Sequence, residues 1–313
     1  MQLKLKAKKK RRATSTLPFM LMLLPGLVLL LINNYLPMLG GVMAFQQYRF
    51  QENFFVSIIN SPFIGFRNFE FIFRSPALLE VLRNTILYNL GFILLGMIVP
   101  VAVAIALSEL WNQRRARFYQ AVMFLPYFLS WIIISYLVFV IFQSSGTLNT
   151  MIMTPLGLGR PDWYRTVGAW PPILIITNLW RFTGYNAVFY LAALSGISRD
   201  YYEASMIDGA KKRQQIWYIT LPHLRPIIII LSLLALGRIF NSDFGLFFNI
   251  PMSRSTLFPV TEVLDTFIYR AMISSTDFGR PVAASLFQSV VGLITIITAN
   301  FIVRKVDAES SLF

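Results

Sequence analysis

Cysteine is absent from this 313-residue sequence, histidine occurs once, and only 13% of the residues are charged. The absence of cysteine excludes disulfides and thiolate metal sites. Soluble domains carry about a quarter charged residues. Because this chain has far fewer, and 56% of its residues are hydrophobic, we expect an all-α integral membrane protein.

Motifs for catalysis and nucleotide binding are also missing. The sequence has no G-x-x-x-x-G-K-[ST] loop for phosphates, no H-E-x-x-H zinc motif and no G-x-S-x-G nucleophile motif. Its one histidine, His223, has no obvious partner, and we interpret it as a structural or interfacial residue. The chain is therefore predicted to have no catalytic residue, no metal site and no cofactor of its own.

The sequence does contain long runs without Asp, Glu, Lys or Arg. Such runs cover Ala13–Tyr48, Asn84–Ser108, Phe118–Gly159 and Pro281–Val303, and two more are broken only by Arg181, Arg238 and Asp243. A spanning helix needs about 20 apolar residues. We therefore expect six spans, over residues 17–40, 85–108, 119–142, 171–194, 226–248 and 281–303, in one transmembrane domain over 17–303. Pro25, Pro100 and Pro126 predict kinks inside these spans.

Basic residues are distributed unevenly over the segments between the spans. If the N-terminus is cytoplasmic, the inner segments hold 17 Lys and Arg and the outer segments hold 9. This bias agrees with the positive-inside rule, so residues 1–16 and 304–313 are both expected in the cytoplasm. The net charge of +14 thus reflects topology and does not indicate a nucleic-acid partner. The basic N-terminus lacks an A-x-A-like cleavage site, so we expect an uncleaved first span in the lipid bilayer.

A charged segment between the fourth and fifth expected spans predicts a helical hairpin over residues 198–222. Ser198 is a candidate N-cap, and acidic residues occupy the first turn, where the helix dipole favours them. Asp208-Gly209 predicts a turn because glycine accepts a positive φ where a helix ends. Lys211–Thr220 predicts a second helix. On physical grounds alone, a docking element and an ordinary solvated loop both fit this pattern.

The same segment resembles the EAA signature of binding-protein-dependent ABC importer permeases, which begins E-A-[SA]-x-x-D-G-A. The matching residues are Glu203, Ala204, Ser205, Asp208, Gly209, Ala210, Thr220, Leu221 and Pro222, with Ser205 in place of the usual third alanine. The chain is similar to the sugar-type, maltose-transport-like permeases over nearly its whole length, including GFRNFEFIFRSP (Gly65–Pro76) and GTLN (Gly146–Asn149). GRIFNSDFGLFF (Gly237–Phe248) most resembles the subgroup for polysaccharide or complex oligosaccharide uptake.

This resemblance implies a type I permease in the bacterial plasma membrane that forms the path for an oligo- or polysaccharide. The hairpin would be the coupling helix, seated in a cytoplasmic ABC ATPase dimer that binds ATP and Mg²⁺. An extracytoplasmic solute-binding protein would deliver the carbohydrate. A second homologous permease subunit, a different chain rather than a copy, would complete the pore. The residues implied to contact the ATPase are Glu203, Ala204, Ser205, Asp208, Gly209, Ala210, Leu221 and Pro222.

Polar residues inside the expected spans are candidates for the translocation path. An ionisable group near the bilayer centre costs about 2.5–3.5 kcal/mol on insertion scales, so it should face a partner or water. The candidates are Asn178, Arg181, Tyr185 and Asn186 in the fourth span and Arg238, Asn241 and Asp243 in the fifth. On a regular helix Asn241 would share the face of Arg238, whereas Asp243 would not.

These groups have two interpretations. They would suit sugar hydroxyls and rings, and the arginines would suit an acidic sugar. Alternatively, they form an internal Arg–Asp network, or Arg181 snorkels outward.

Two other functions stay open from the residues alone. An ion-coupled secondary transporter would need buried carboxylates, for which Asp243 is the one candidate, and no inverted repeat is visible. A membrane receptor or scaffold would use the hairpin as an adaptor site. Copurification with an ATPase and a binding protein would support only the importer.

Overall fold

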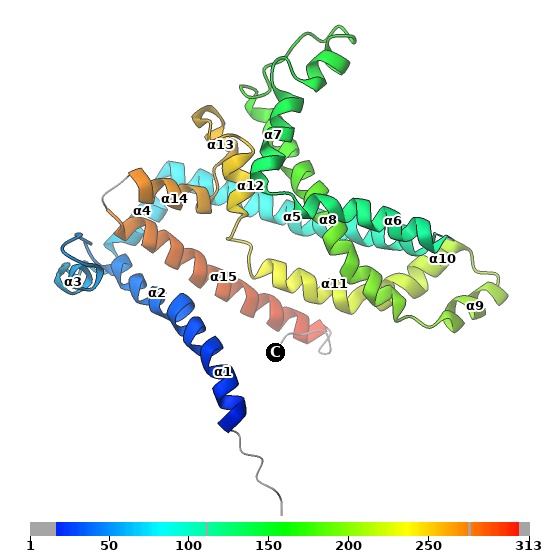
Figure 1. Cartoon of the computed structure of the whole chain (residues 1–313), viewed down its shortest axis with the longest axis horizontal. Helices are drawn as coiled ribbons and strands as arrows, with labels where there is room; N and C mark the ends of the chain where they lie inside the picture. Colours follow the sequence, from blue (N-terminus) through cyan, green and yellow to red (C-terminus); the bar gives the residue numbers. More distant parts are fainter. Residues whose placement is uncertain (1–16, 111, 275–276, 307–313) are drawn as a thin grey trace, which may run out of the picture.

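The computed structural model describes residues 17–110, 112–274 and 277–306. Residues 1–16 and 307–313, which include most of the segments expected in the cytoplasm at the two ends, lie outside the described residues. Figure 1 shows that the described part is built from helices, with one isolated bridge between Gln46 and Phe63. The expected all-α fold is confirmed.

Seven long helices carry the architecture in the described part. They are α1 (Leu17–Leu30), α5 (Pro76–Ser108), α6 (Gln113–Phe124), α7 (Trp131–Phe142), α8 (Trp170–Ser195), α11 (Leu221–Leu236) and α15 (Gly279–Val306). The first continues through η1 (Leu31–Tyr35), α2 (Leu36–Met38) and η2 (Leu39–Phe45).

Short helices connect them: α3 (Phe54–Asn60), α4 (Arg67–Arg74), η3 (Leu125–Phe128), η4 (Asn149–Met153), η5 (Val167–Ala169), α9 (Arg199–Ile207), α10 (Lys212–Gln215), η6 (Ile216–Thr220), α12 (Phe244–Asn249), η7 (Ser255–Leu257), α13 (Phe258–Thr261) and α14 (Leu264–Ser274).

By length and composition, four described helices can cross a membrane, and a bent pair makes up to five. The four are Pro18–Phe45, Pro76–Ser108, Lys212–Leu236 and Gly279–Lys305, and the pair is Gln113–Phe128 with Trp131–Phe142. Helix α8 has 26 residues and is therefore about 39 Å long, but its polar residues keep it outside this set. The expected count of six spans is thus not reached by these criteria.

The third expected span, 119–142, is two helices that meet at an angle of 99°. Pro126 lies in the 3-10 turn η3, where it cannot donate a backbone hydrogen bond. Ser130 then caps α7, because its side chain accepts a hydrogen bond from the backbone N–H of Ile133 at 3.3 Å. The kink expected at Pro126 is therefore a full break. Pro25 and Pro100 lie inside α1 and α5, which continue past them.

The fifth expected span, 226–248, is wrong at its C-terminal end. Helix α11 ends at Leu236, residues 237–243 are irregular, and α12 begins at Phe244. Asp243 caps α12 by accepting from the backbone N–H of Leu246. A side chain at Gly237 would come within 2.7 Å of Ile296 on α15, so the chain turns where two helices touch closely. An apolar count cannot detect such a tertiary break.

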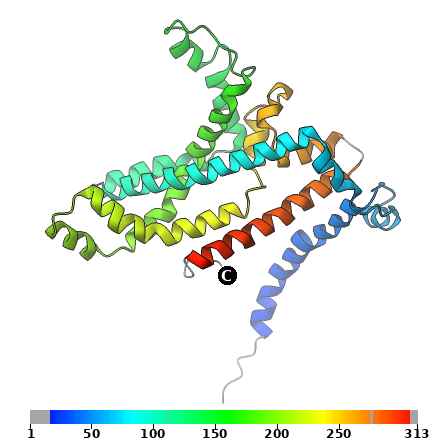
Figure 2. The ribbon, with the colours of Figure 1, turned by 180° about the vertical axis from the view of Figure 1, so that it is seen from behind.

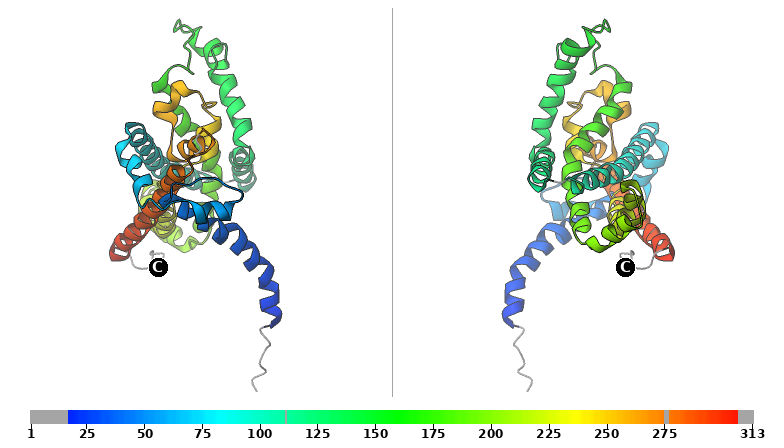
Figure 3. Two further views of the ribbon diagram at one scale, coloured as in Figure 1. Left: turned by 90° about the vertical axis from the view of Figure 1, so that its left-hand side faces the viewer. Right: turned by 90° about the vertical axis from the view of Figure 1, so that its right-hand side faces the viewer.

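The long helices α5 and α8 pack along one another, and α6 crosses α8. The crossing is tight, because a side chain at Gly184 would collide with the backbone of Met123. Figure 2 shows α5, α11 and α15 running in the same general direction across the molecule. Figure 3 shows α1 pointing away from this bundle, and only its continuation η2 packs against α4 and α15.

The connections gather at two ends of the molecule. Figure 1 shows α9 and α10 at one end, next to the C-terminal end of α5 and the start of α6, whereas α3, α4 and α14 lie at the opposite end. The fold therefore places the predicted hairpin at one end and the outer helices α3, α4 and α14 at the other, while the predicted outer segment 143–170 projects separately beyond α7 at the top of Figure 1.

Candidate functional site

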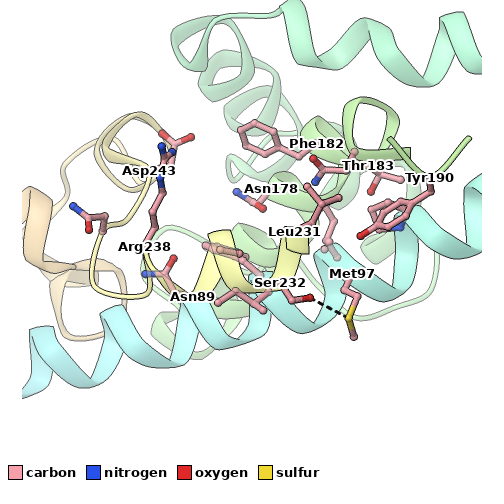
Figure 4. A pocket seen from close by; sticks show the side chains of 18 residues that line it. Asn89, Met97, Asn178, Phe182, Thr183, Tyr190, Leu231, Ser232, Arg238 and Asp243 are labelled. Atoms are coloured by element: carbon pink, nitrogen blue, oxygen red, sulfur yellow. Dashed lines mark hydrogen bonds between the residues drawn. The ribbon is translucent and has the colours of Figure 1, made fainter. Parts of the chain in front are cut away.

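A cavity of about 380 Å³ lies between α5, α8, α11 and the irregular segment 237–243. Its polar lining consists of Asn89, Asn178, Thr183, Asn186, Ser232, Arg238, Asn241 and Asp243, and its aromatic lining of Phe92, Phe182 and Tyr190. In Figure 4, Arg238 and Asp243 lie at one end of the cavity, and Tyr190 and Met97 lie at the other. The site thus offers amides, hydroxyls, a guanidinium and ring faces within one space.

Five of the seven residues predicted for the path line this cavity: Asn178, Asn186, Arg238, Asn241 and Asp243. The expectation that Asp243 lies off the Arg238 face was wrong, because it assumed a regular helix and α11 ends before both residues. The irregular backbone lets Arg238, Asn241 and Asp243 line the same cavity.

Arg181 and Tyr185 are not among the residues that line the cavity. Tyr185 stacks on Tyr127, with ring centroids 4.2 Å apart and an angle of 7° between the planes. Arg181 lies over the ring of Trp131, with its Cζ 4.0 Å from the centroid. Its Nε is buried without a hydrogen-bond partner in the described part of the chain. The structure therefore places both side chains against the broken third span.

Side chains distant in sequence hold the irregular segment in place. The Asn89 amide donates to Ile239 O at 2.9 Å and to Ser242 Oγ at 3.1 Å. The Gln288 amide, on α15, donates to Phe240 O at 2.7 Å. The backbone N–H of Ser242 donates to Asp265 Oδ2 at 2.7 Å. Non-helical backbone at membrane depth needs such partners, because lipid offers none.

Trp131 connects three elements at the end of the cavity that carries Asp243. Its indole N–H donates to Asp243 Oδ2 at 2.9 Å. Its ring packs so closely on α12 that a side chain at Gly245 would collide with it. The Arg181 guanidinium covers its face, which is a favourable cation–π arrangement. Trp131 thereby fixes α7, α8 and α12 relative to one another.

The cavity is lined by one guanidinium, Arg238, and one carboxylate, Asp243, which form no salt bridge with each other. Arg238 is exposed and forms no ion pair with any described residue. Asp243 lines the same cavity, but its oxygens accept from Trp131 and from the N-terminus of α12. A guanidinium in a low-dielectric, water-accessible space attracts anions strongly.

The predicted hairpin turn is confirmed in detail. Helix α9 is capped by Ser198, whose side chain accepts from Asp200 N–H at 3.3 Å. Gly209 has a φ of +78°, and Ala210 N–H donates to Ser205 O at 2.9 Å. These features form the Schellman motif of a helix that ends with glycine.

Inside the hairpin, Ser205 faces the second helix. The buried Gln215 amide donates to Ser205 Oγ at 2.8 Å and to Tyr202 O at 3.3 Å. Tyr202 also shares a hydrogen bond with Thr220 at 3.0 Å. A salt bridge of 2.6 Å between Lys212 and Glu109 joins the hairpin to the end of α5. Ser205 therefore stabilises the hairpin from within.

The outer surface of the hairpin is more apolar than an ordinary solvated loop requires. Ile207 is 88% exposed, and Met206, Trp217 and Tyr218 are also exposed. The predicted contact residues Glu203, Ala204, Asp208, Gly209 and Pro222 share this exposure, whereas Ser205, Ala210 and Leu221 are partly buried. An exposed apolar patch with a polar rim is typical of a protein-binding site.

Sequence reasoning missed the second and third spans as contributors to the site. Asn89 is an amide in a charge-free run, which is a usable signal, since a polar group in a membrane helix needs a partner. Trp131 gives no signal in the sequence, because its role depends on Arg181 and Asp243, which are 50 and 112 positions away. No group of three His, Cys, Asp or Glu side chains able to hold a metal ion occurs within 17–110, 112–274 and 277–306.

The comparisons with known proteins agree with this geometry. The model of the family described as "Binding-protein-dependent transport system inner membrane component" matches residues 93–307. The chain therefore belongs to this family, whose members are membrane-spanning permease subunits of ABC importers. Membership favours the importer over the ion-coupled carrier and the receptor or scaffold, and it makes the chain a transport subunit and not an enzyme.

Two relatives come from Bacillus subtilis (strain 168). Protein LplB is 34% identical over 92% of this chain and 89% of its own length. The polygalacturonan/rhamnogalacturonan transport system permease protein YteP is 30% identical over 92% of this chain and 88% of its own length.

Two solved structures share the fold. One is a bacterial ABC transporter involved in the import of the acidic polysaccharide alginate, with a TM-score of 0.84, 30% identity, and 93% of this chain and 96% of that chain covered. The other is a bacterial alginate ABC transporter in complex with an alginate pentasaccharide-bound periplasmic protein, with a TM-score of 0.83, 29% identity, and coverage of 93% and 95%.

Proposed function

We propose that this chain forms half of the translocation path of an ATP-driven importer for an acidic oligo- or polysaccharide. The observation that carries the proposal is Arg238, a guanidinium without an ion pair in a cavity lined by three asparagine amides from α5 and α8 and by aromatic rings. Amides pair with sugar hydroxyls, ring faces pack on the apolar faces of sugars, and a guanidinium binds a carboxylate through two parallel hydrogen bonds.

The names of the similar proteins support an acidic substrate. YteP is named for polygalacturonan and rhamnogalacturonan, and the structural neighbour imports alginate. Galacturonan and alginate both consist of uronates, which carry one carboxylate on each sugar ring. A polymer of this kind would present repeated anionic groups to Arg238 as it moves through the path.

The hairpin 198–222 serves as the coupling element in this proposal. It contacts a cytoplasmic ABC ATPase dimer that binds ATP and Mg²⁺, with the exposed Met206 and Ile207 beside Gly209 as the apolar part of the contact. The N- and C-termini then lie in the cytoplasm, in agreement with the 17 basic residues on that side. Because Gly209 closes the turn through local hydrogen bonds, the hairpin can transmit force as a rigid unit.

Two further partners complete the importer. A solute-binding protein docks on the outer loops, as the structural neighbour with its periplasmic protein suggests. A second, different permease chain closes the open side of the cavity. Over most of its length the first helix, α1, has no packing partner among residues 17–110, 112–274 and 277–306, and it is available for contact with that subunit.

The test is uptake by the reconstituted importer, with its ATPase and binding protein, of uronate oligosaccharides and of neutral oligosaccharides of equal length. Arg238→Ala removes a charge-assisted hydrogen bond and is expected to lower uronate uptake about tenfold or more. Arg238→Lys keeps the positive charge but loses the bidentate geometry, so its uronate uptake should lie between that of the wild type and that of Arg238→Ala.

Arg304→Ala, which removes an exposed arginine in the last turn of α15 away from the cavity and from the outer loops, is the matched control and should leave uptake unchanged. Uronate uptake that is equal in Arg238→Ala and wild type would show that Arg238 does not contact the substrate. Stronger uptake of neutral than of uronate sugars by the wild type would show that the substrate is not acidic.

A further inference from the structure

A second and larger cavity, of about 790 Å³, lies at the hairpin end of the molecule. It is enclosed by the end of α5, the first two turns of α6, the end of α8 and the base of the hairpin. Figure 1 shows these elements converging at the end that carries α9 and α10. The cavity is separate from the path cavity, and none of the predicted site residues lines it.

The charged lining of this cavity marks the edge of the membrane. Glu109 is the first charged residue after the charge-free run Asn84–Ser108, and Arg117 is the last one before the run that starts at Phe118. Arg199 follows the run that ends at Ser198. Two charge-free runs, and a third that is broken only by Arg181, therefore end at this one cavity, as expected of a site at the depth of the lipid phosphates.

Of the three basic residues that line the cavity, two are not neutralised by an ion pair with a described residue. Lys212 pairs with Glu109 at 2.6 Å. Arg117 and Arg199 form no ion pair with a residue in the described part of the chain. They come from α6 and from the start of the hairpin, so one anion between them would connect these two elements.

The rest of the lining is mixed, with the polar residues Ser108, Gln113, Gln120, Ser195, Tyr202 and Thr220 beside a group of apolar ones. Leu107, Leu110, Leu191, Leu194 and Ile197 line the cavity together with the basic groups. Phe118 and Val122, exposed on α6, continue the apolar surface toward the membrane. A small soluble anion gains no binding energy from apolar side chains, whereas a phospholipid has both a phosphate for the arginines and acyl chains for the apolar surface.

From this arrangement we infer that the cavity is a binding site for an anionic phospholipid of the cytoplasmic leaflet. The phosphate lies between Arg117 and Arg199, and the start of the acyl chains lies against the leucines. Basic pockets between membrane helices on the cytoplasmic side suit such head groups. The inference depends on the proposed placement of the hairpin in the cytoplasm. Because the lipid bridges α6 and the hairpin, it holds the hairpin at the angle needed for the ATPase.

Lipid retention gives the direct test. The complete importer is purified in detergent without ATP or sugar, and the bound phosphatidylglycerol is counted by native mass spectrometry. Arg117→Gln with Arg199→Gln is expected to weaken retention about 30-fold, because each basic residue near anionic lipid contributes about fivefold. Arg114→Gln with Arg115→Gln removes the same charge from α6, the helix that carries Arg117, but outside the cavity, and is expected to retain the lipid.

Coupled ATPase activity gives the second readout, in nanodiscs of phosphatidylcholine with or without phosphatidylglycerol. Phosphatidylglycerol should stimulate the wild type and the control pair but not the cavity variant. Equal retention in all three proteins would overturn the inference. Stimulation by inorganic phosphate in place of the lipid would assign the cavity to a soluble anion. Loss of activity by the cavity variant in pure phosphatidylcholine would assign it to an acidic side chain of a partner subunit. Retention is independent of sugar, so a wrong substrate assignment would leave it unchanged.

Discussion

Helices α9 and α11 both end near a glycine, and their two ends are stabilised in opposite ways. Helix α9 ends at the hairpin turn, where Gly209 takes a φ of +78° and Ala210 N–H bonds to Ser205 O five residues earlier. Helix α11 ends at Leu236, just before Gly237, and the following segment is bonded to Asn89 and Gln288, each tens of residues or more away in the chain.

The comparison separates local from tertiary control of the backbone. The hairpin carries its own hydrogen bonds, so it can stay rigid while the bundle moves around it. The segment 237–243 depends on α5, α14 and α15, so any movement of these helices changes the position of Arg238 in the cavity. A force-transmitting element suits the first kind of control, and a substrate path that must open and close suits the second.

The largest expected effect comes from removing a tertiary partner of the break. Gln288→Leu leaves Phe240 O without a donor and removes the Gln288 bonds at 3.2 and 3.3 Å to the Asp265 carboxylate. Unpaired buried polar groups cost about 1–3 kcal/mol each, so we expect the free energy of unfolding to fall by about 3 kcal/mol. Denaturant unfolding of the purified chain in detergent measures it.

Ser289→Ala is the control for this variant. Ser289 is exposed and bonds only to Ser285 O within its own helix. Its loss should change the free energy of unfolding by less than about 0.5 kcal/mol. If both variants unfold alike, the segment 237–243 does not depend on α15, and the contrast between the two helix ends fails.

The same contrast explains what the sequence could predict. The hairpin could be predicted because Ser198 and Gly209 act on backbone groups within a few residues. The long helices over 171–194 and 281–303 could be predicted because apolar composition is a sum over one segment, and α8 and α15 cover these ranges. These features need no knowledge of neighbours.

The predictions that failed concerned features that depend on contacts between segments distant in the sequence. The end of α11 at Leu236 lies where Gly237 closely approaches Ile296 of α15, and the segment after it is held by Asn89 and Gln288. The placement of Asp243 in the cavity follows from Trp131 and from the break itself. Arg181 had the right polarity for the path but lies on Trp131, since the bend of the third span brings that ring to it. Composition cannot report such pairings, because each needs two distant segments at once.

A smaller effect on stability is expected at the end of α9, where the turn at Gly209 is held by local hydrogen bonds. A Cβ at Gly209 would meet no atom within 4 Å, so a substitution there acts only through the positive φ. Gly209→Val should destabilise the turn by about 1–2 kcal/mol, whereas Gly209→Asn should cost much less, because asparagine tolerates this conformation. We expect the valine variant to hydrolyse more ATP for each sugar transported, with little change in global unfolding.

The ratio of ATP hydrolysed to sugar transported is the measurement for Gly209, and Gly209→Asn is the control. Equal ratios in the valine and asparagine variants would mean that turn geometry has no part in coupling. A large drop in the unfolding temperature of Gly209→Val would mean that the hairpin is not an independent unit.

The smallest expected effect is a pH dependence of the unfolding temperature that comes from Asp265, which holds the segment 237–243 after α11. Burial raises the pKa of Asp265 above its ordinary value of 3.8, although hydrogen bonds from Ser242 and Gln288 oppose the shift. The folded chain therefore binds this proton more tightly than the unfolded chain. The contribution to stability is complete below pH 3.8 and is lost as the pH rises through the folded-state pKa. Asp265→Asn keeps an acceptor for Ser242 N–H and cannot ionise, so its unfolding temperature should fall less than that of the wild type as the pH is raised from the acidic side. Parallel curves for the two proteins would show that the carboxylate bears no net burial cost, and that the partners around the break compensate its charge fully.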